Sequence, residues 1–408
     1  MSTVATFVVV GANQAGGTAA AELREQGFEG RVVLIGDDPR PPYERPPLSK
    51  EYLRGEQPLE AGYVRPEAWW QEHDVQTHFG ERAERIDTGD RTVMLQGGEE
   101  IAYDRLLLAT GARNRRLPMP GLDLEGVFDL RTAGDARRIS EAASAATQVV
   151  IVGMGFIGAE VSASLRSRGL EVTVIDPGET PLHRVLGPDI GAVIRDIHGD
   201  HGVRMYFGDV VESFQGDGRV GTVITRSGRR LECDFVVVGV GVQPNVELAE
   251  NTGIEVQNGI MVDAGLETNV PGVYAAGDVA LHDHPTFGRI RVEHWDNALK
   301  MGQHAARSML GDKQAFDDPH WFWSDQYDAN LQMAGFASSW DEIAYRGRVE
   351  DRSFSAFFLK GGRLLSAFSL NRPRDVRRAM RLIRAGVHPS ADQLRDENVD
   401  LRALLPSM

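Results

Sequence analysis

Apolar residues recur along the chain in short runs that follow the same order in two stretches. Each stretch opens with an apolar strand, a glycine-rich turn and a helix of small residues. Each later carries a hairpin-like segment, TVMLQGGEEIAY in the first and VGTVITRSGRRLEC in the second, and ends in a nearly continuous apolar strand, at residues 104–111 and 234–241. Strands that are apolar throughout are typical of parallel sheets covered on both faces by helices. The pattern predicts two α/β nucleotide-binding domains that form a diverged internal repeat.

The pattern changes beyond about Pro319. Aromatic residues gather there, and the segment SFSAFFLKGGRLLSAFSL alternates like antiparallel strands before one basic helix. This indicates a third domain of the α+β class. Its aromatic pair, Trp321 and Trp323, belongs either to the core of that domain or to a surface that shields a bound cofactor.

The second repeat carries a complete dinucleotide fingerprint, G-x-G-x-x-G, at Gly153, Gly155 and Gly158. The next strand ends at Asp176, 23 residues after Gly153. In this arrangement the glycines let the backbone approach a pyrophosphate, and the acidic side chain binds a ribose 2′-hydroxyl. Asp176 would repel a 2′-phosphate, and no arginine follows before Arg184. The site is therefore predicted to prefer NADH to NADPH.

The first repeat has the same frame with one substitution. Gly11 and Gly16 occupy the outer fingerprint positions, Asn13 stands at the middle one, and the next strand ends at Asp37. Asparagine tolerates a left-handed backbone better than most non-glycine residues, so the turn is expected to survive. The helix N-terminus still offers free N–H groups to an anion. We interpret the turn as a second nucleotide site, the alternative being a decayed site that only folds.

Composition narrows the functional classes. The 408 residues carry a net charge of −15, which argues against nucleic acid or anionic lipid as the main partner, since both attract positive charge. No apolar run is long enough to predict a membrane span, and the N-terminal FVVVGA is interpreted as a core strand rather than a signal peptide. The single cysteine, Cys233, excludes an internal disulfide and a dithiol redox pair. We expect a cytoplasmic protein without a metal site, with His282 and His284 in a polar loop.

Eight stretches, spread almost from end to end, carry a family resemblance. They are RPPYERPPLSK (40–50), LLLATGAR (106–113), LRTAGDA (130–136), VGMGFIGAEV (152–161), VVGVGVQPN (237–245), GVYAAGDVA (272–280), VEHWDNA (292–298) and WFWSDQYDANLQMAG (321–335). Together they resemble the FAD-dependent NAD(P)H:ferredoxin reductases of oxygenase systems, the family of putidaredoxin reductase, rhodocoxin reductase and the biphenyl and toluene dioxygenase reductases. Asn13 departs from that family, which usually has glycine there.

The resemblance implies a glutathione reductase-like architecture with FAD and NADH as cofactors. It implies an FAD-binding domain at residues 1–113 and 244–318, an NADH-binding domain at 114–243 and a C-terminal α+β domain at 319–408. Implied FAD contacts are Gly11, Asn13, Ala15, Gly16, Asp37, Lys50, Ala83, Arg131, Asp278 and Trp295. Implied NAD contacts are Gly153, Gly155, Gly158, Glu160, Asp176, Arg184 and Gly241.

The implied activity is hydride transfer from NADH to flavin, followed by release of single electrons to a [2Fe–2S] ferredoxin that feeds a cytochrome P450 or Rieske-type oxygenase. Lys50 and Glu160 are the predicted catalytic pair, because a lysine would stabilise a reduced, anionic flavin and a glutamate would hold that lysine. A solvated lysine and a first-turn carboxylate at a helix N-terminus are the alternatives. Relatives that reduce disulfides or peroxide place a cysteine near residue 42, where this chain has Pro42.

The segment from Lys360 to Arg384 is basic in an otherwise acidic chain. Arg374, Arg378 and Arg381 fall at spacings of four and three, which places them on one helical face. That face is predicted to dock an acidic ferredoxin, unless it is only a solvated surface. Two other functions remain open on the same fold: an NADH oxidase or small-acceptor reductase, and a flavoprotein whose redox state regulates a binding partner.

Overall fold

The structure, a computed structural model, describes residues 4–406. The chain divides into two compact units. The first comprises Met1–Arg45, Leu59–Arg113 and Val242–Asp318, and the second Pro46–Pro58, Asn114–Gly241 and Pro319–Met408. The sequence predicted three domains: an FAD-binding, an NADH-binding and a C-terminal domain. Their bounds stay a prediction, because the division into two units groups residues 114–241 with 319–408. Across residues 4–406, no helix combines the length and apolar character needed to cross a membrane.

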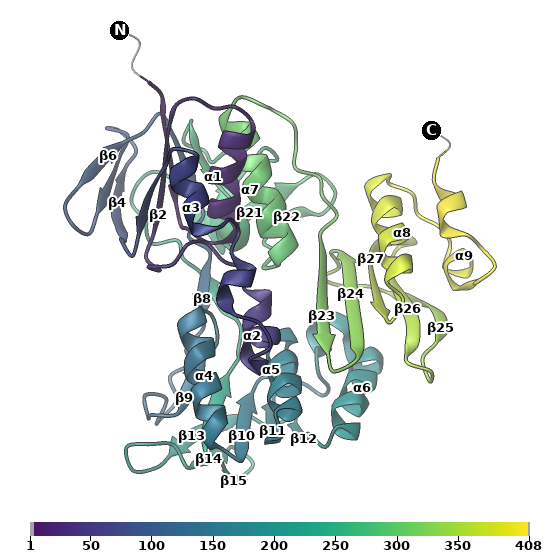
Figure 1. Cartoon of the computed structure of the whole chain (residues 1–408). Helices are drawn as coiled ribbons and strands as arrows, with labels where there is room; N and C mark the ends of the chain where they lie inside the picture. The colour runs from purple at the N-terminus through teal and green to yellow at the C-terminus, as the bar shows by residue number, and fades with distance from the viewer. Residues whose placement is uncertain (1–3, 407–408) are drawn as a thin grey trace. The chain divides into compact units, whose positions relative to one another are not determined.

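The first unit is built on a five-stranded parallel sheet, of which β2 is labelled in Figure 1. Its strands run in the order β20-β7-β1-β2-β3. Its central strand β1 buries Val8 and Val9 completely, as expected for a strand covered on both faces. The strands of this sheet are β1 Thr6–Val10, β2 Arg31–Gly36, β3 Val75–Phe79, β7 Arg105–Leu108 and β20 Val273–Ala275. Its helices are α1 Gln14–Glu25, α3 Glu67–Glu72 and α7 Trp295–Met309, with short turns at Leu59–Gly62 and Gly277–Val279.

Two smaller sheets complete the first unit. The predicted hairpin is confirmed as β5 and β6 of an antiparallel sheet, β4 Ala83–Asp87, β5 Thr92–Leu95 and β6 Glu100–Ala102. A four-stranded sheet holds β18 Val256–Gln257, β19 Gly259–Val262, β21 Ala280–His284 and β22 Gly288–Ile290.

The second unit contains the matching parallel sheet, in the order β12-β11-β10-β16-β9. Its strands are β9 Val127–Asp129, β10 Gln148–Val152, β11 Glu171–Asp176, β12 Arg204–Phe207 and β16 Phe235–Val238. Its helices are α2 Glu51–Arg54, α4 Ala133–Ala145, α5 Phe156–Ser167 and α6 His183–Asp200, with a short turn at Pro46–Ser49. An antiparallel sheet of β13 Val211–Gln215, β14 Thr222–Thr225 and β15 Arg230–Glu232 confirms the second predicted hairpin. The strands β8 Ala112–Asn114 and β17 Val242–Pro244 pair where the chain passes from one unit to the other.

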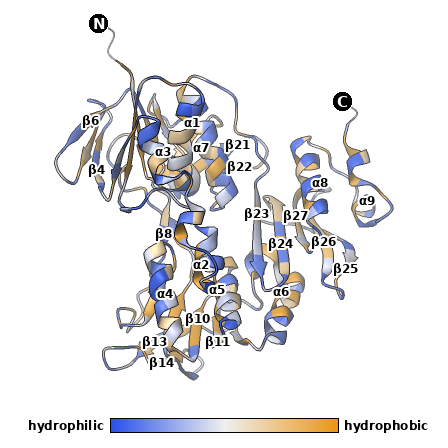
Figure 2. Cartoon of the chain, viewed as in Figure 1, coloured by the Kyte–Doolittle hydropathy of each residue, from blue (hydrophilic) through white to orange (hydrophobic). Residues whose placement is uncertain are grey.

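The C-terminal part of the second unit is an antiparallel sheet followed by helices, so the predicted α+β class is confirmed. The strands run in the order β23-β24-β27-β26-β25. They are β23 Trp321–Gln326, β24 Ala329–Gly335, β25 Glu342–Arg348, β26 Ser353–Lys360 and β27 Arg363–Leu370, and they precede α8 Pro373–Arg384, α9 Ala391–Arg395 and a turn at Leu401–Leu404. Hydrophobic and hydrophilic residues alternate along α8 (Figure 2), because one face covers the sheet.

The predicted internal repeat is visible in the strand register. In the first unit Val10 pairs with Ile35, and in the second Val152 pairs with Ile175. Gly11 and Gly153 follow these strands directly, so each glycine turn lies at the carboxyl end of the central strand of a parallel sheet. Ligands of open α/β sheets bind at this edge.

Candidate functional site

The second glycine turn separates two kinds of glycine. A Cβ on Gly153 would lie 2.3 Å from the carbonyl oxygen of Gly239, and one on Gly158 would lie 2.0 Å from that of Gly153. These two glycines are required by close backbone packing. A Cβ on Gly155 would meet no atom within 4 Å, and Gly155 is exposed. The missing side chain at Gly155 therefore leaves open space before the N-terminus of α5, where a pyrophosphate fits.

Asp176 lies at the end of β11, beside this turn. Its carboxylate accepts a 2.6 Å hydrogen bond from the backbone N–H of Met154 and another of 2.6 Å from that of Gly178. The acid therefore fixes the turn between Gly153 and Gly155, in addition to its predicted contact with ribose. Each carboxylate oxygen has a second lone pair, so both roles are compatible.

The first glycine turn repeats the packing. A Cβ on Gly11 would lie 2.2 Å from the carbonyl oxygen of Ala109, and one on Gly16 would lie 1.9 Å from that of Gly11. Gly11 has the left-handed backbone, with φ 111°. Asn13 is extended, with φ −112°, and forms the N-cap position of α1. The expectation that asparagine is tolerated there for its left-handed conformation was wrong, because the middle position of the turn never adopts that conformation.

The Asn13 side chain has a defined partner. Its Oδ1 accepts a 2.6 Å hydrogen bond from the guanidinium of Arg45. The Asn13 amide thus holds the Arg45 guanidinium beside the turn that would receive a pyrophosphate. The guanidinium donors and its positive charge suit an anion such as pyrophosphate. These residues are compatible with a nucleotide, which favours a working site over a decayed one.

Other predicted FAD contacts of the first unit lie around α1. The Trp295 indole, at the start of α7, donates a 2.9 Å hydrogen bond to Gln14 Oε1, directly after Asn13. Asp37 is exposed one residue beyond the end of β2. Asp278 lies in the Gly277–Val279 turn, and its carbonyl accepts from Arg291.

Lys50 and Glu160 form a buried ion pair in the second unit. The Lys50 Nζ lies 2.6 Å from Glu160 Oε2, and each side chain is only 4% exposed. Glu160 Oε2 also accepts a 2.5 Å hydrogen bond from Ser49, and Oε1 accepts one of 2.7 Å from Ser324. A buried carboxylate with three donors is well compensated. Lys50 is therefore not a solvated lysine, and Glu160 is part of a buried ion pair rather than only a carboxylate near a helix N-terminus. The catalytic role of the pair stays a prediction.

Comparison with known proteins places this geometry in a family. The model of the pyridine nucleotide-disulphide oxidoreductases matches residues 5–302, and that of the reductase C-terminal domain matches 321–405. The chain belongs to the pyridine nucleotide-disulphide oxidoreductase family.

Within this family, rhodocoxin reductase of Rhodococcus erythropolis is 40% identical over 97% of this chain and 93% of its own length. The ferredoxin–NAD(+) reductase component of the anthranilate 1,2-dioxygenase system of Burkholderia cepacia is 37% identical over 98% and 99%. A crystal structure of the covalent putidaredoxin reductase–putidaredoxin complex matches at 33% identity, with a TM-score of 0.95, over 98% of each chain. These matches confirm the predicted fold class and the resemblance to ferredoxin reductases of oxygenase systems.

The family description includes disulfide chemistry, for which this sequence offers no cysteine pair. Cys233 is its single cysteine; it is buried, and burial raises the pKa of its thiol to about 12. Pro42 packs against α1, where a Cβ on Gly17 would lie 2.6 Å from the proline Cβ. A member of this family with these residues must transfer electrons without a cysteine pair.

The remaining predicted cofactor contacts fall into two groups. Ala15 and Ala83 are buried in the core of the first unit. A Cβ on Gly302 of α7 would lie 2.4 Å from the Ala15 carbonyl oxygen, so α1 and α7 pack closely at Ala15. In the second unit Arg131 is half-buried, whereas Arg184 and Gly241 are exposed. Their contacts with cofactor stay predictions.

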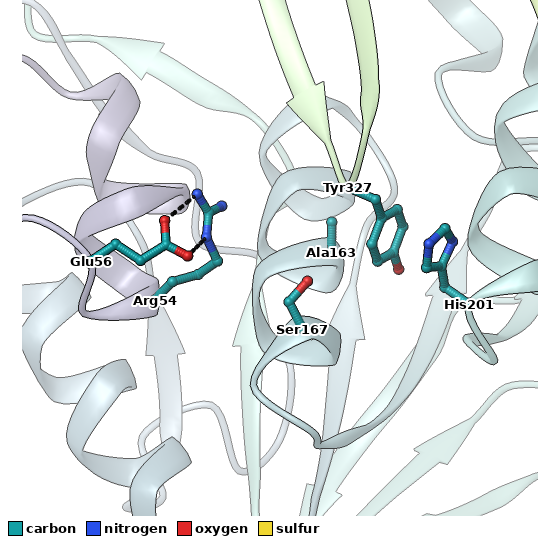
Figure 3. Close-up of a pocket in the computed structure, with 6 residues that line it drawn as sticks. All are labelled: Arg54, Glu56, Ala163, Ser167, His201 and Tyr327. Carbon is teal, nitrogen blue, oxygen red and sulfur yellow. Dashed lines mark hydrogen bonds and ion pairs between the residues drawn. The ribbon is translucent and has the colours of Figure 1, made fainter.

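A pocket of about 400 Å³ opens beside the second half of α5 (Figure 3). It is lined by Arg54, Glu56, Ala163, Ser167, His201 and Tyr327. The guanidinium of Arg54 already makes two 2.7 Å hydrogen bonds with Glu56. Because Ala163 and Ser167 lie about one and a half and two and a half helical turns beyond Gly158, the pocket is separate from the predicted NADH site.

The histidines expected in a polar loop are buried instead. His282 and His284 lie on β21, each 2% exposed, and burial lowers the pKa of His282 to about 4. The alternating sequence LHDHP is a strand with its histidines facing inward. A different cluster, His78, Glu81 and Glu99, brings potential metal-ligand atoms within 4.8 Å of one another, but His78 already bonds Gln76 and Glu81.

The basic helix α8 presents the predicted arginines to different degrees. Arg374 and Arg381 are exposed, whereas Arg378 is half-buried and lies 3.4 Å from the buried carboxylate of Asp375. Arg377 is also exposed. The docking face of Arg374, Arg378 and Arg381 stays a prediction.

Sequence reasoning missed Arg45, Gln14, Ser49 and Ser324. Arg45 and Ser49 lie inside the motif RPPYERPPLSK, and Ser324 lies inside WFWSDQYDANLQMAG, so the motifs marked the right segments. Only the fold shows which of their polar side chains reaches the turn or the ion pair.

Proposed function

We propose that this chain is an FAD-dependent NADH:ferredoxin reductase that supplies a [2Fe–2S] ferredoxin of a cytochrome P450 or Rieske-type oxygenase. When bound, FAD accepts a hydride from NADH and passes its electrons on singly. The observation that carries the proposal is the buried Lys50–Glu160 pair, held at 2.6 Å, in a chain with a single cysteine. The relatives named as reductases of ferredoxin, rhodocoxin and putidaredoxin support the electron acceptor.

The residues of this chain would bind and orient the two nucleotides. Gly11, Asn13 and Gly16, with Arg45, would hold the pyrophosphate of FAD, and Asp37 its ribose. Gly155 and Asp176 would hold NADH at the second turn. Lys50 would present its ammonium to the reduced flavin, while Glu160 fixes that ammonium in one position. Since both side chains are buried, water is excluded from their charges and their field acts at full strength.

We also propose that the ferredoxin docks on the exposed arginines of α8, Arg374, Arg377 and Arg381. The partner class is acidic, and long-range attraction to a basic face speeds association. The cytoplasm is the proposed compartment, because the single buried thiol gives the chain no use for an oxidising environment.

The proposed function is tested by NADH-driven reduction of cytochrome c, with and without an added [2Fe–2S] ferredoxin. We expect fast reduction only with ferredoxin. Equal rates without it would favour the NADH oxidase or small-acceptor reductase, and no reduction of the flavin by NADH would favour the regulatory flavoprotein.

The docking face is tested by reversing Arg374 and Arg381 to glutamate. Reduction of ferredoxin should slow, most clearly at low salt, because steering is screened within about 8 Å at physiological ionic strength. Reduction of ferricyanide should stay near normal. Reversal of Arg137 and Arg138, two exposed arginines of α4, makes the same change in net charge and serves as the control. If the reversals on α8 leave ferredoxin reduction unchanged, the surface around Arg113, Arg115 and Arg116 becomes the candidate. If the control slows ferredoxin reduction equally, the effect is one of net charge.

A further inference from the structure

One face of β23 is fitted to one face of α5. The ring of Phe322 packs edge-to-face on Phe156, with centroids 4.4 Å apart, and the hydroxyl of Ser324 donates to Glu160 Oε1 at 2.7 Å. Residues two apart share a strand face, and residues four apart share a helix face. The two contacts therefore align β23 with the first turns of α5. The aromatic contact is apolar, and the polar contact is the hydrogen bond from Ser324 to Glu160.

A chain of hydrogen bonds runs from the end of β23 to Glu160 with all its donors in one direction. Ser324 Oγ accepts from Gln326 Nε2 at 3.1 Å, and Gln326 Oε1 accepts from His198 Nε2 at 2.9 Å. The hydroxyl of Tyr327 lies 3.3 Å from the other ring nitrogen, Nδ1, and donates to it. Burial lowers the pKa of His198 to about 4, so its ring is neutral and has one donor and one acceptor nitrogen.

The outer end of this chain is held in a strained conformation. Tyr327 has φ 57°, a left-handed backbone that is unfavourable for a bulky residue. Its ring stacks on His201, with centroids 3.6 Å apart, at the wall of the pocket beside α5 (Figure 3). Strain of this kind persists only where surrounding contacts fix it. The turn after β23 is thus shaped to place Tyr327 against His198 of α6 and His201, which directly follows that helix.

We propose that Ser324 is a positioning residue by which the C-terminal domain holds the Glu160 carboxylate, in its charged form and in the rotamer that pairs it with Lys50. This inference rests on the proposed function, in which that ion pair faces the flavin. Glu160 meets Lys50, Ser49 and Ser324 among the described residues, so Lys50 is the charge that faces it and the two serines are its neutral donors. Aligned donors polarise one another, and Gln326, His198 and Tyr327 keep the Ser324 proton directed at Glu160.

The test compares three variants of the full-length, FAD-loaded protein. Ser324→Ala removes the donor, Ser324→Thr keeps the hydroxyl on a residue suited to a strand, and Ser366→Ala removes a buried hydroxyl of the same sheet that donates to the Ala334 carbonyl instead. Thermal melting and FAD content establish that each variant is folded. The rate of flavin reduction by NADH is then measured from pH 5 to 9 in a stopped-flow instrument.

We expect Ser324→Ala to change the dependence of this rate on pH, since a hydrogen bond to the charged carboxylate of Glu160 is lost. Ser324→Thr should restore the wild-type profile, and Ser366→Ala should leave it unchanged. A profile of Ser324→Ala that superimposes on the wild type overturns the proposal, as does an equal displacement by Ser366→Ala.

A second measurement separates this inference from the proposed function. The ¹³Cδ signal of Glu160, assigned by its loss in Glu160→Gln, is recorded at one pH in the oxidised holoprotein without NADH. In Ser324→Ala its chemical shift should change, because a hydrogen-bond donor to that carboxylate is lost, whether or not the wild type reduces a ferredoxin. An unchanged chemical shift overturns the role of Ser324, whereas failure of ferredoxin reduction in the wild type overturns only the proposed function.

Discussion

The two glycine turns share a backbone. Gly11 and Gly153 follow the central strands with φ 111° and 98°, and in both turns the last glycine packs its Cα on the first one's carbonyl, where a Cβ would lie 1.9 or 2.0 Å away. This frame leaves the N-terminus of α1 or α5 open to the predicted dinucleotide. Because the frame is common to both turns, it does not decide which nucleotide each turn would bind.

The side chains on this frame differ at three equivalent positions. Asn13 stands where the second turn has Gly155, and Gly36 stands where the second has Asp176. Thr18, which accepts a 3.2 Å hydrogen bond from Gln14, stands where α5 has the buried Glu160. In the first repeat Asn13 accepts a hydrogen bond from the guanidinium of Arg45, Thr18 accepts one from Gln14, and Gly36 has no side chain. The second repeat carries two acids at the equivalent positions. The two turns therefore share a backbone and differ in the charge of the side chains around it.

The largest effect should come from the glycines that both turns share. Gly16→Ala and Gly158→Ala force a Cβ onto a backbone oxygen, and we expect each to lose more than about 4 kcal/mol of unfolding free energy. Gly155→Ala points its methyl into open space and should keep wild-type stability while it raises the KM for NADH. Urea denaturation and steady-state kinetics distinguish them. Equal stability of Gly158→Ala and Gly155→Ala would contradict the packing role.

The next test breaks the comparison at the helix position after the turn. Glu160→Gln leaves the Lys50 ammonium buried without its counter-charge, and we expect a loss of about 3 kcal/mol of unfolding free energy together with slower flavin reduction. Thr18→Val at the equivalent position removes one neutral hydrogen bond and should cost about 1 kcal/mol. Both values are measured by urea denaturation. Similar losses of unfolding free energy in the two variants would show that the Lys50–Glu160 ion pair contributes no more than one neutral hydrogen bond.

The repeat, the parallel sheets and the nucleotide turns were predictable because they rest on local patterns. Apolar strands, glycines at fixed spacing and acids after the next strand are visible in sequence. The pairing of Lys50 with Glu160 came from the family resemblance and was then found at 2.6 Å. Spacing alone could not give it, since 110 residues separate the two.

The predictions that failed depend on three-dimensional surroundings. His282 and His284 were taken for a loop because a polar alternating segment reads alike in an exposed loop and in a strand whose histidines face a core. The roles of Arg45 and Ser324 were missed because each acts on a residue far away in the chain.

A smaller effect distinguishes the acids of the two repeats. The wild type should prefer NADH to NADPH by at least about tenfold in kcat/KM, equivalent to about 1.4 kcal/mol. Asp176→Asn should narrow this ratio, mainly by weakening NADH, because one acceptor and the charge are lost. Asp37→Asn, in the first repeat, should leave the ratio unchanged and lower FAD retention instead. If the NADH/NADPH ratio changes in Asp37→Asn and not in Asp176→Asn, then NADH binds at the first turn and FAD at the second.

The smallest effect should come from exchanging the middle residues of the turns. Asn13→Gly removes the amide that binds Arg45 but gives the backbone the same open approach as Gly155, so we expect FAD affinity to be equal or slightly tighter, within about 1 kcal/mol. Gly155→Asn fills the open space of the second turn, and it should raise the KM for NADH severalfold. FAD release on dilution and steady-state kinetics measure the two changes. If Asn13→Gly instead releases FAD readily, the amide itself, or the Arg45 it holds, contacts the cofactor, and the first turn has replaced its glycine by a specific ligand.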